Sequence, residues 1–329
     1  MSQDRADLVP VRLSKARTNV PRRSSQTADR IFNASLVGSA WLVLFVVIGL
    51  LLVLIVAALP AIKQLGFSAL AGTEWSPSDG KYGVLSFVYG TAVTSLIALV
   101  LAGPIGIAVA LFLSELAPRR LAAVVGVLVE LLAAVPSVVY GLWGLFVLAP
   151  VMRTTVQPVL EKSLGALPLF QGPPLGIGML TGGILLSIMI LPTVAAIARD
   201  VFAAVPNDQR EGMLALGSTK WEMLTKAVLP YARSGVIGAL VLALGRAMGE
   251  AMAVVMVIGN TPAISASLFH PAYTMASVLA NEFTEATGQT YVGVLIEIGV
   301  LLFGLSVVVN VLARVLVWSV SPTSRGARA

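Results

Sequence analysis

The sequence predicts an all-α, polytopic membrane protein with six membrane-spanning helices. Its 329 residues are 57% hydrophobic and only 12% charged, whereas soluble domains are about 45–50% apolar and about 25% charged. The mean hydropathy is +0.91. The charges are gathered at the two ends and in short clusters, and long apolar stretches separate them. This composition excludes a soluble fold, because such a fold could not bury so much apolar surface.

Each of six apolar stretches is long enough to cross a bilayer as a helix. A helix of about 20 residues, rising about 1.5 Å per residue, crosses a hydrocarbon core about 30 Å thick. None of the stretches alternates residue by residue, as strands of a membrane β-barrel do. The predicted spans are residues 31–60, 82–114, 121–152, 175–198, 234–259 and 291–313.

The distribution of Lys and Arg predicts the orientation. With six spans, both termini lie on the side that carries 17 of the 22 basic residues, while the other side carries 4 and Arg246 lies within a span. Because cytoplasmic loops are enriched in Lys and Arg, both termini are expected in the cytoplasm. The chain then divides into a basic tail (1–30), a six-span domain (31–320) and a C-terminal tail (321–329). The net charge of +6 reflects this orientation and does not indicate nucleic-acid binding.

The cytoplasmic segment 199–230 predicts two short helices joined at a glycine. Asn207 suits the N-cap of the first helix, and Gly217 suits the left-handed position that follows its last turn. Thr219, followed three residues later by Glu222, is the pattern of a capping box and opens the second helix.

Trp221, Leu224 and Val228 recur on one face of this second helix, and Pro230 is expected to end it at the membrane. A helix pair of this size cannot span a bilayer. It either rests at the lipid interface as an amphipathic element or docks a cytoplasmic subunit.

Four ionisable residues fall inside the predicted spans: Glu130, Arg246, Glu250 and Glu297. A charged side chain at a helix centre costs about 2.5–3.5 kcal/mol on insertion scales, so it is expected to be paired or to line a polar pathway. Arg246 and Glu250, four residues apart on one predicted helix, are expected to share a face and to pair. The pair either fastens helices together or lines the path of a charged solute.

The guanidinium fork of Arg246 matches carboxylate, phosphate or sulfate and favours an anion as that solute. Glu130 and Glu297 are expected to be protonated and hydrogen-bonded between helices, or to lie on such a path. The sequence has no Cys and one His, which excludes disulfides, thiolate metal sites and histidine clusters. No metal site and no catalytic residue is therefore expected.

One cytoplasmic segment carries a family signature. ABC importer permeases have a loop with Glu-Ala-Ala, three residues, Gly, nine residues and Ile-x-Leu-Pro. The Glu, the Gly and the Leu-Pro have matches here at the same spacing, whereas the two alanines and the isoleucine do not. The corresponding residues are Glu211-Gly212-Met213, Gly217 and Ala227-Val228-Leu229-Pro230.

Residues 130–141, 198–202 and 244–254 are more specific and resemble the PstC permease family of bacterial phosphate importers. The resemblance runs from about residue 35 to 320. It implies a type I ABC importer permease in the bacterial cell membrane that pairs with a PstA-like permease. It also implies two PstB-like ATPases below the membrane and a PstS-like phosphate-binding protein outside it.

The resemblance also assigns roles to residues. It implies that Arg246, Glu250 and possibly Glu130 take part in phosphate passage. Coupling to the ATPase is implied for the cytoplasmic residues Glu211, Gly217, Trp221 and Pro230. The chain has no Gly-x-x-x-x-Gly-Lys-Ser/Thr loop, so ATP binding and hydrolysis are expected of the partner, and no cofactor is expected here. Alternatives are a permease for another oxyanion, such as sulfate or molybdate, and a secondary anion transporter without an ATPase.

Overall fold

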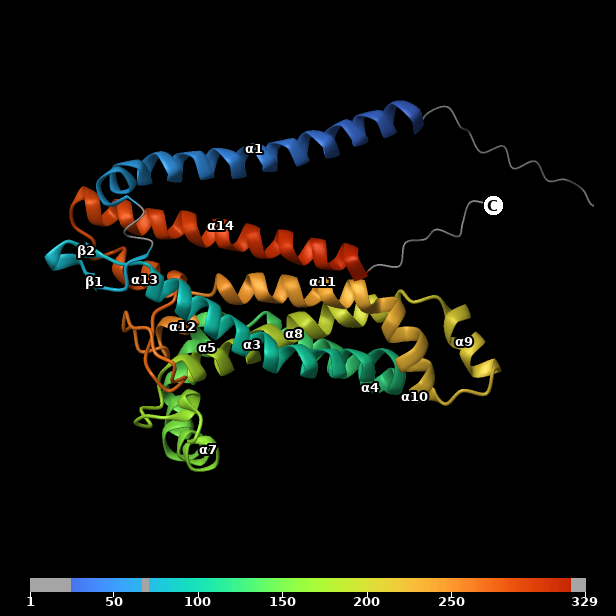
Figure 1. Ribbon diagram of the computed structural model, residues 1–329. Coiled ribbons are helices and arrows are strands. Elements are labelled where there is room, and N and C mark those ends of the chain that lie inside the picture. Colours follow the sequence, from blue (N-terminus) through green and yellow to red (C-terminus); the bar gives the residue numbers. More distant parts are fainter. Residues whose placement is uncertain (1–24, 67–70, 321–329) are drawn as a thin grey trace, which may run out of the picture. The chain divides into compact units, whose positions relative to one another are not determined.

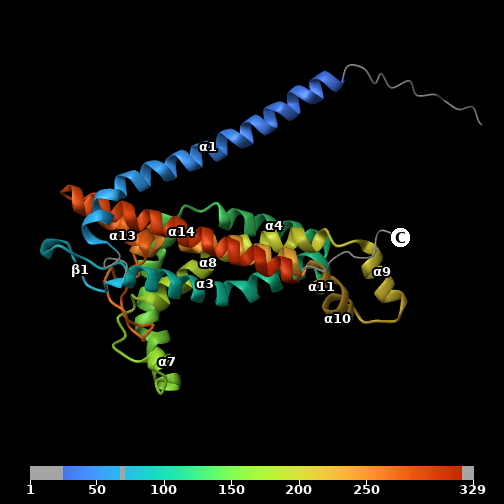
Figure 2. The ribbon, with the colours of Figure 1, turned by 45° about the horizontal axis from the view of Figure 1, so that its top comes forward.

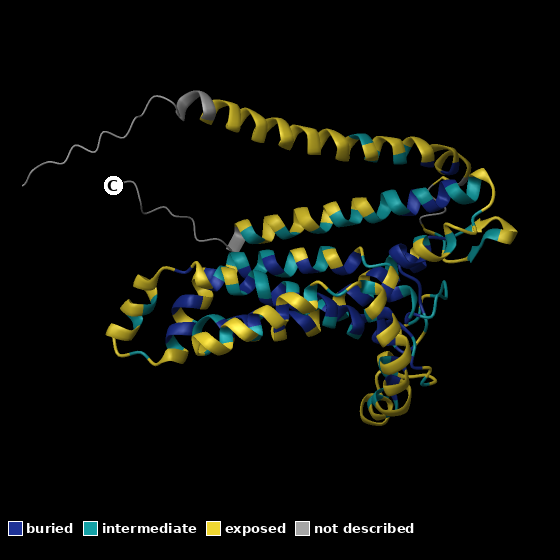
Figure 3. Cartoon of the chain, turned by 180° about the vertical axis from the view of Figure 1, so that it is seen from behind, coloured by how far each residue is buried: buried dark blue, intermediate teal, exposed yellow. Residues whose placement is uncertain are grey.

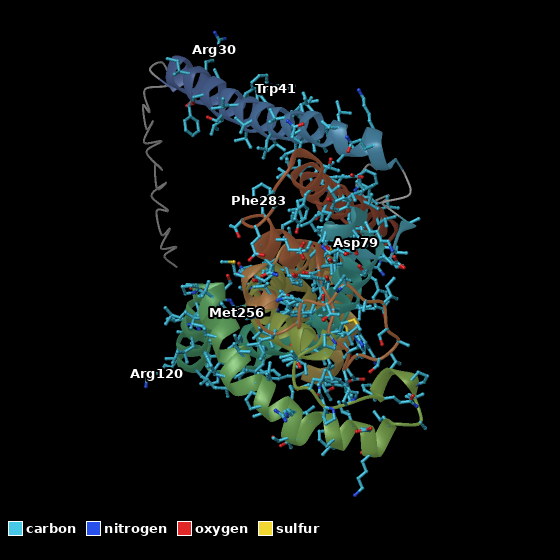
Figure 4. The ribbon with its side chains drawn as sticks, turned by 90° about the vertical axis from the view of Figure 1, so that its left-hand side faces the viewer. Arg30, Trp41, Asp79, Arg120, Met256 and Phe283 are labelled. Atoms are coloured by element: carbon cyan, nitrogen blue, oxygen red, sulfur yellow. The ribbon has the colours of Figure 1, made fainter. Side chains whose placement is uncertain are left out.

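The computed structural model describes residues 25–66 and 71–320. The chain divides into two compact units, residues 1–52 and 53–329. In its described part the first unit is one helix, the N-terminal portion of α1 (Ser25–Leu65), along which apolar side chains such as Trp41 are exposed (Figure 4). The helix begins inside the predicted basic tail, whereas residues 1–24 and 321–329 of the predicted tails lie outside the described residues.

Three helices form the centre of the second unit: α3 (Leu85–Leu111), α8 (Met179–Ala203) and α11 (Leu229–Met248). α8 is largely buried (Figure 3). Small residues let the helices approach closely. A Cβ at Gly106 of α3 would lie 2.8 Å from Val194 Cβ, and one at Gly183 of α8 would lie 2.6 Å from Ile97 Cγ2. The packing of α3 on α8 therefore depends on glycine at both positions.

The other elements lie around this centre. A short hairpin and α13 lie at one end of the helices, and α9 and α10 lie at the other (Figures 1 and 2). Their bounds are β1 (Trp75–Ser76), β2 (Lys81–Tyr82), α4 (Arg119–Ala133), α5 (Ser137–Trp143), α6 (Ala149–Val151), α7 (Gln157–Leu164), α9 (Asn207–Ala215), α10 (Lys220–Met223), α12 (Met252–Val255), α13 (Met275–Glu282) and α14 (Gln289–Val320).

Six helices in the described residues are long and apolar enough to cross a membrane, as predicted. Four predicted spans lie on such helices, but the prediction of one helix over residues 121–152 is wrong. α4 ends at Ala133, the chain is extended at Pro136, and the helix of spanning length is Ser137–Leu164. The break has a local cause, because the residue that precedes a proline is disfavoured in the α conformation.

The prediction of a helix over residues 234–259 is also wrong at both ends. The continuous helix is Lys220–Met248, and non-helical backbone separates it from α12. Beyond α12, the non-helical backbone finds partners in neighbouring segments: Gly178 N donates to Val257 O at 3.0 Å, and Ala272 N donates to Ile258 O at 3.0 Å. Non-helical backbone is tolerated at membrane depth where the protein satisfies it in this way.

Three wide, π-helical turns lie inside continuous helices of the described chain. Each ends two residues before a proline. A proline ring clashes with the carbonyl group four residues earlier, and that carbonyl belongs to the middle residue of each turn. Because a π turn bonds residues five apart, it moves this carbonyl away and lets the helix continue. The turns and their prolines are Gly144–Leu148 with Pro150, Met152–Val156 with Pro158, and Leu224–Val228 with Pro230.

Candidate functional site

Arg246 and Glu250 lie on either side of the break that ends α11. Arg246 is in the last helical turn and is exposed, while Glu250 follows the C-cap Gly249 and is half-buried. The predicted pair on one helix is wrong, because the helix ends before Glu250. The ion pairs of the described residues include neither side chain. Glu250 Oε1 instead accepts a long hydrogen bond, 3.4 Å, from Ala253 N in α12.

The break is held by close contact between α5 and α12. A Cβ at Gly141 would lie 2.6 Å from Met256 Sδ and 3.1 Å from Ala253 Cα, so this approach requires glycine. Met256, marked in Figure 4, follows α12. Asn260 then turns the chain with a left-handed φ of 47°, and its Nδ2 donates to Val255 O at 2.9 Å. Arg246 therefore lies in the last helical turn of α11, next to a non-helical segment that packs closely against α5.

Glu130 has a cationic partner that the sequence did not reveal. It lies on α4 and pairs with Arg199 of α8, with 3.1 Å between Glu130 Oε1 and Arg199 Nη2. Gly126, one turn earlier on α4, leaves room for the guanidinium, since a Cβ there would lie 2.4 Å from Arg199 Nη1. Glu130 thus contacts a cationic side chain of a second helix, and α4 is joined to α8 by this pair.

Glu297 is 5% exposed on α14. Its Oε2 has no hydrogen-bond partner among the described residues. The expected hydrogen bond between helices is therefore not made by this oxygen.

The segment that connects α8 to α11 folds largely as predicted up to Glu222. α9 ends before Gly217, whose φ of 82° is left-handed, and Thr219 and Glu222 form the predicted capping box. The predicted N-cap is wrong. Pro206, not Asn207, occupies the N-cap of α9, and no side chain caps that helix.

Pro230 does not end the second helix. Its ring is accommodated by the π turn at Leu224–Val228, and α10 runs through that turn into α11. The predicted apolar face is also divided: Leu224 and Val228 are buried, whereas Trp221 is 72% exposed. Most residues of the segment around α9 are exposed (Figure 3), and Glu211 belongs to this surface, whereas Arg210 and Met213 are partly buried. At its tip, Leu216 is 85% exposed.

Comparison with known proteins identifies the family. A family model described as "Binding-protein-dependent transport system inner membrane component" matches residues 102–321. The chain belongs to this family. A "Phosphate transport system permease protein PstC" from Mesorhizobium japonicum is 45% identical over 318 residues, which cover 95% of this chain and 96% of the relative. A "Probable phosphate transport system permease protein PstC" from Methanocaldococcus jannaschii is 39% identical over 261 residues, which cover 78% of this chain and 82% of the relative.

Solved structures show the same fold for this permease. A chain of the inward-facing MetNI methionine ABC transporter matches with a TM-score of 0.52 and 18% identity, over 76% of this chain and all of that one. A chain of a bacterial alginate ABC transporter matches with a TM-score of 0.53 and 16% identity, over 87% of this chain and 93% of that one. The permease thus has the predicted fold of ABC importer membrane subunits and is a multi-pass inner membrane protein.

An ion pair at the base of α9 was missed in the sequence. Arg210 of the permease binds Glu115, which lies in a π turn (Phe112–Leu116) at the end of α3. The two residues are 95 positions apart, and the predicted second span stopped one residue before Glu115. In the sequence, Glu115 stands out only as an acidic residue next to the end of an apolar stretch. That position does not indicate which basic residue it contacts.

At the opposite end of the permease, a half-buried carboxylate joins a hairpin to two helices. Glu282 Oε2 accepts hydrogen bonds from Trp75 Nε1 at 2.9 Å and from Tyr291 Oη at 2.6 Å. Nearby, the pKa of Tyr273 is raised to about 12, chiefly because burial disfavours the phenolate. This cluster ties the β1–β2 hairpin to α13 and α14, so Trp75 is an anchor within the protein.

Proposed function

We propose that this chain is a membrane permease subunit of an ATP-driven phosphate importer. In this proposal it forms the pathway with a PstA-like permease, a PstS-like protein delivers phosphate from outside, and two PstB-like ATPases bind at the cytoplasmic face. The observation that carries the proposal is the 45% identity to a phosphate transport permease along 95% of the chain. The excess of basic residues on one side supports both termini in the cytoplasm.

Arg246 is the residue proposed to meet the anion. It is exposed at the break of α11 and has no ion-pair partner in the described chain. A cation at this depth is stabilised by water, by a partner chain or by a passing anion. Its five donors suit the oxygens of phosphate. Glu250 and Glu130 lie on or near the same path in this proposal.

The energy source follows from the charge of the substrate. Moving an anion inward against a negative-inside potential costs about 2.3 kcal/mol per charge per 100 mV. A passive pore would not accumulate it, so an external energy source is required, and in this proposal that source is ATP hydrolysis by the partner. The exposed surface with Glu211, Gly217 and Trp221, and the helix that continues through Pro230, support the role of this segment as the contact with the ATPase.

Uptake into proteoliposomes tests the substrate and the energy source together. The complex purified through this chain is expected to contain an ATPase and to take up labelled phosphate only with ATP and the binding protein. Excess unlabelled phosphate should compete, and sulfate or molybdate should not. Stronger competition by sulfate or molybdate would assign another oxyanion, and ATP-independent uptake would assign a secondary transporter.

Arg246→Leu tests the pathway. The variant is expected to lose uptake by at least about a hundredfold, because a charge-assisted hydrogen-bond donor to the anion is removed, while the complex still assembles. Arg314→Leu, at an exposed arginine of α14, is the matched control and should retain uptake. Normal uptake by Arg246→Leu would remove this residue from the pathway.

A further inference from the structure

The most extensively bonded side chain in the cytoplasmic part of the permease is Arg210 of α9. Its Nη2 lies 2.7 Å from Glu115 Oε1, and its Nε lies 3.2 Å from Glu115 Oε2. The side chains of Arg210 and Glu115 are only 16% and 7% exposed. This is a two-point contact between a planar fork and a carboxylate, which fixes orientation as well as distance.

The remaining donors of the same guanidinium reach the end of α8 and the turn that follows it. Nη2 also donates to Phe202 O at 2.8 Å, and Nη1 donates to Val205 O and to Asn207 Oδ1. Arginine has five N–H groups, and these contacts use all of them. One side chain thus joins α9, the end of α8 and the end of α3.

Apart from Arg210, α9 is held among the described residues by Met213, a partly buried side chain that packs against the apolar cluster of Phe202 and Leu224. None of its residues is buried, and no side chain caps its N-terminus. The neighbouring ion pair Lys226–Glu222 is exposed and lies within one helix, so it adds little to the position of α9. A partly buried pair behaves differently, because loss of one partner leaves the other charge uncompensated.

We propose that Glu115 and Arg210 are a positioning pair that makes α9 move as one piece with the cytoplasmic ends of α3 and α8. A push on the exposed surface of α9 is then delivered to α3 through the carboxylate of Glu115, in addition to the covalent route along the chain. The transport test below rests on the proposed function, whereas the distance test does not.

The distance test uses the absence of cysteine from the chain. Spin labels are placed at Leu216→Cys, near the tip of α9, and at Arg120→Cys, the exposed residue marked at the start of α4 in Figure 4. The purified full-length permease is expected to give one narrow distance distribution. Glu115→Gln is expected to broaden it, and Arg210→Lys, which keeps the charge but loses the fork, to broaden it less. An unchanged, narrow distribution in Glu115→Gln would overturn the proposal.

The transport test uses the reconstituted complex. Glu115→Gln is expected to assemble and to hydrolyse ATP, but to move roughly tenfold less phosphate per ATP. Glu74→Gln disrupts an ion pair of the same 2.7 Å length that is exposed on the hairpin, and it should leave that ratio unchanged.

A merely structural role would lower ATP hydrolysis and transport in proportion, or would prevent assembly, and either result would overturn the proposal. If the wild-type complex takes up no phosphate, the proposed function fails, while the distance test still decides the role of the pair.

Discussion

Gly217 is the residue on which the turn between α9 and α10 depends. Its φ of 82° is left-handed, and no atom lies within 4 Å of the position that a Cβ would take. A substitution there would therefore lower stability through backbone strain and not through a steric clash. Gly217→Ala is expected to destabilise the permease by about 1 kcal/mol. The measurement is the thermal unfolding of the detergent-solubilised chain.

Gly212 provides the matched control, because it also has open space around it but lies inside α9. Gly212→Ala should raise helix stability by up to about 1 kcal/mol. Equal effects of the two substitutions would contradict the assignment of the turn.

Tyr273 predicts a dependence on alkaline pH. Its pKa is about 10 in the unfolded chain and is raised to about 12 by burial in the folded one. The neutral phenol therefore contributes stability that is fully present below pH 10 and is lost as pH rises through 12. Thermal unfolding followed from pH 9 to 12 should show this loss, and Tyr273→Phe should reduce its slope. An unchanged slope in the variant would assign the loss to other groups.

At the scale of elements, the hairpin and α13 are joined by Glu282. Glu282→Ala would leave Trp75 Nε1 and Tyr291 Oη without their acceptor, at a cost of about 1–3 kcal/mol. Glu285→Ala removes an exposed carboxylate three residues away and should change stability by less than about 0.5 kcal/mol. The two variants are compared by thermal unfolding. Equal unfolding temperatures of the two variants would show that the Glu282 carboxylate does not stabilise the contact between these elements.

Helix ends were predictable only where their cause is local. The left-handed Gly217 and the Thr219–Glu222 capping box follow from neighbouring residues, and both were predicted correctly. The non-helical path that follows α12 depends on backbone partners distant in sequence, since Ala272 N donates to Ile258 O, and no local pattern indicates such a partner. Pro230 shows the same limit, since a proline stops a helix or widens it into a π turn according to how its surroundings pack.

At the scale of the whole molecule, composition was sufficient to predict the class of protein and the number of spans. It also singled out Arg246, because a lone arginine in an apolar stretch is unusual in any arrangement of helices. The partners of charged residues were not accessible in this way. Glu130 and Arg199, or Glu115 and Arg210, come together only when helices distant in sequence pack.

The orientation of the whole molecule can be tested with single cysteines in the cysteine-free chain. Leu216→Cys is expected to react with an impermeant maleimide only from the cytoplasmic side, and Lys81→Cys only from the outside. Ala98→Cys, at a fully buried position, should not react before unfolding. Labelling of the first two positions from the same side would contradict the six-span topology.

The π turns have a consequence for the length of the chain. A turn that bonds residues five apart contains one residue more than an α-helical turn, so each behaves as a single-residue insertion that its proline keeps in place. A homologous permease without a proline at the position of Pro230 has no need of that extra residue. Its aligned sequence should then open a one-residue gap within residues 224–228, and deletion of one residue there, together with Pro230→Ala, should be tolerated better than elsewhere in the same helix.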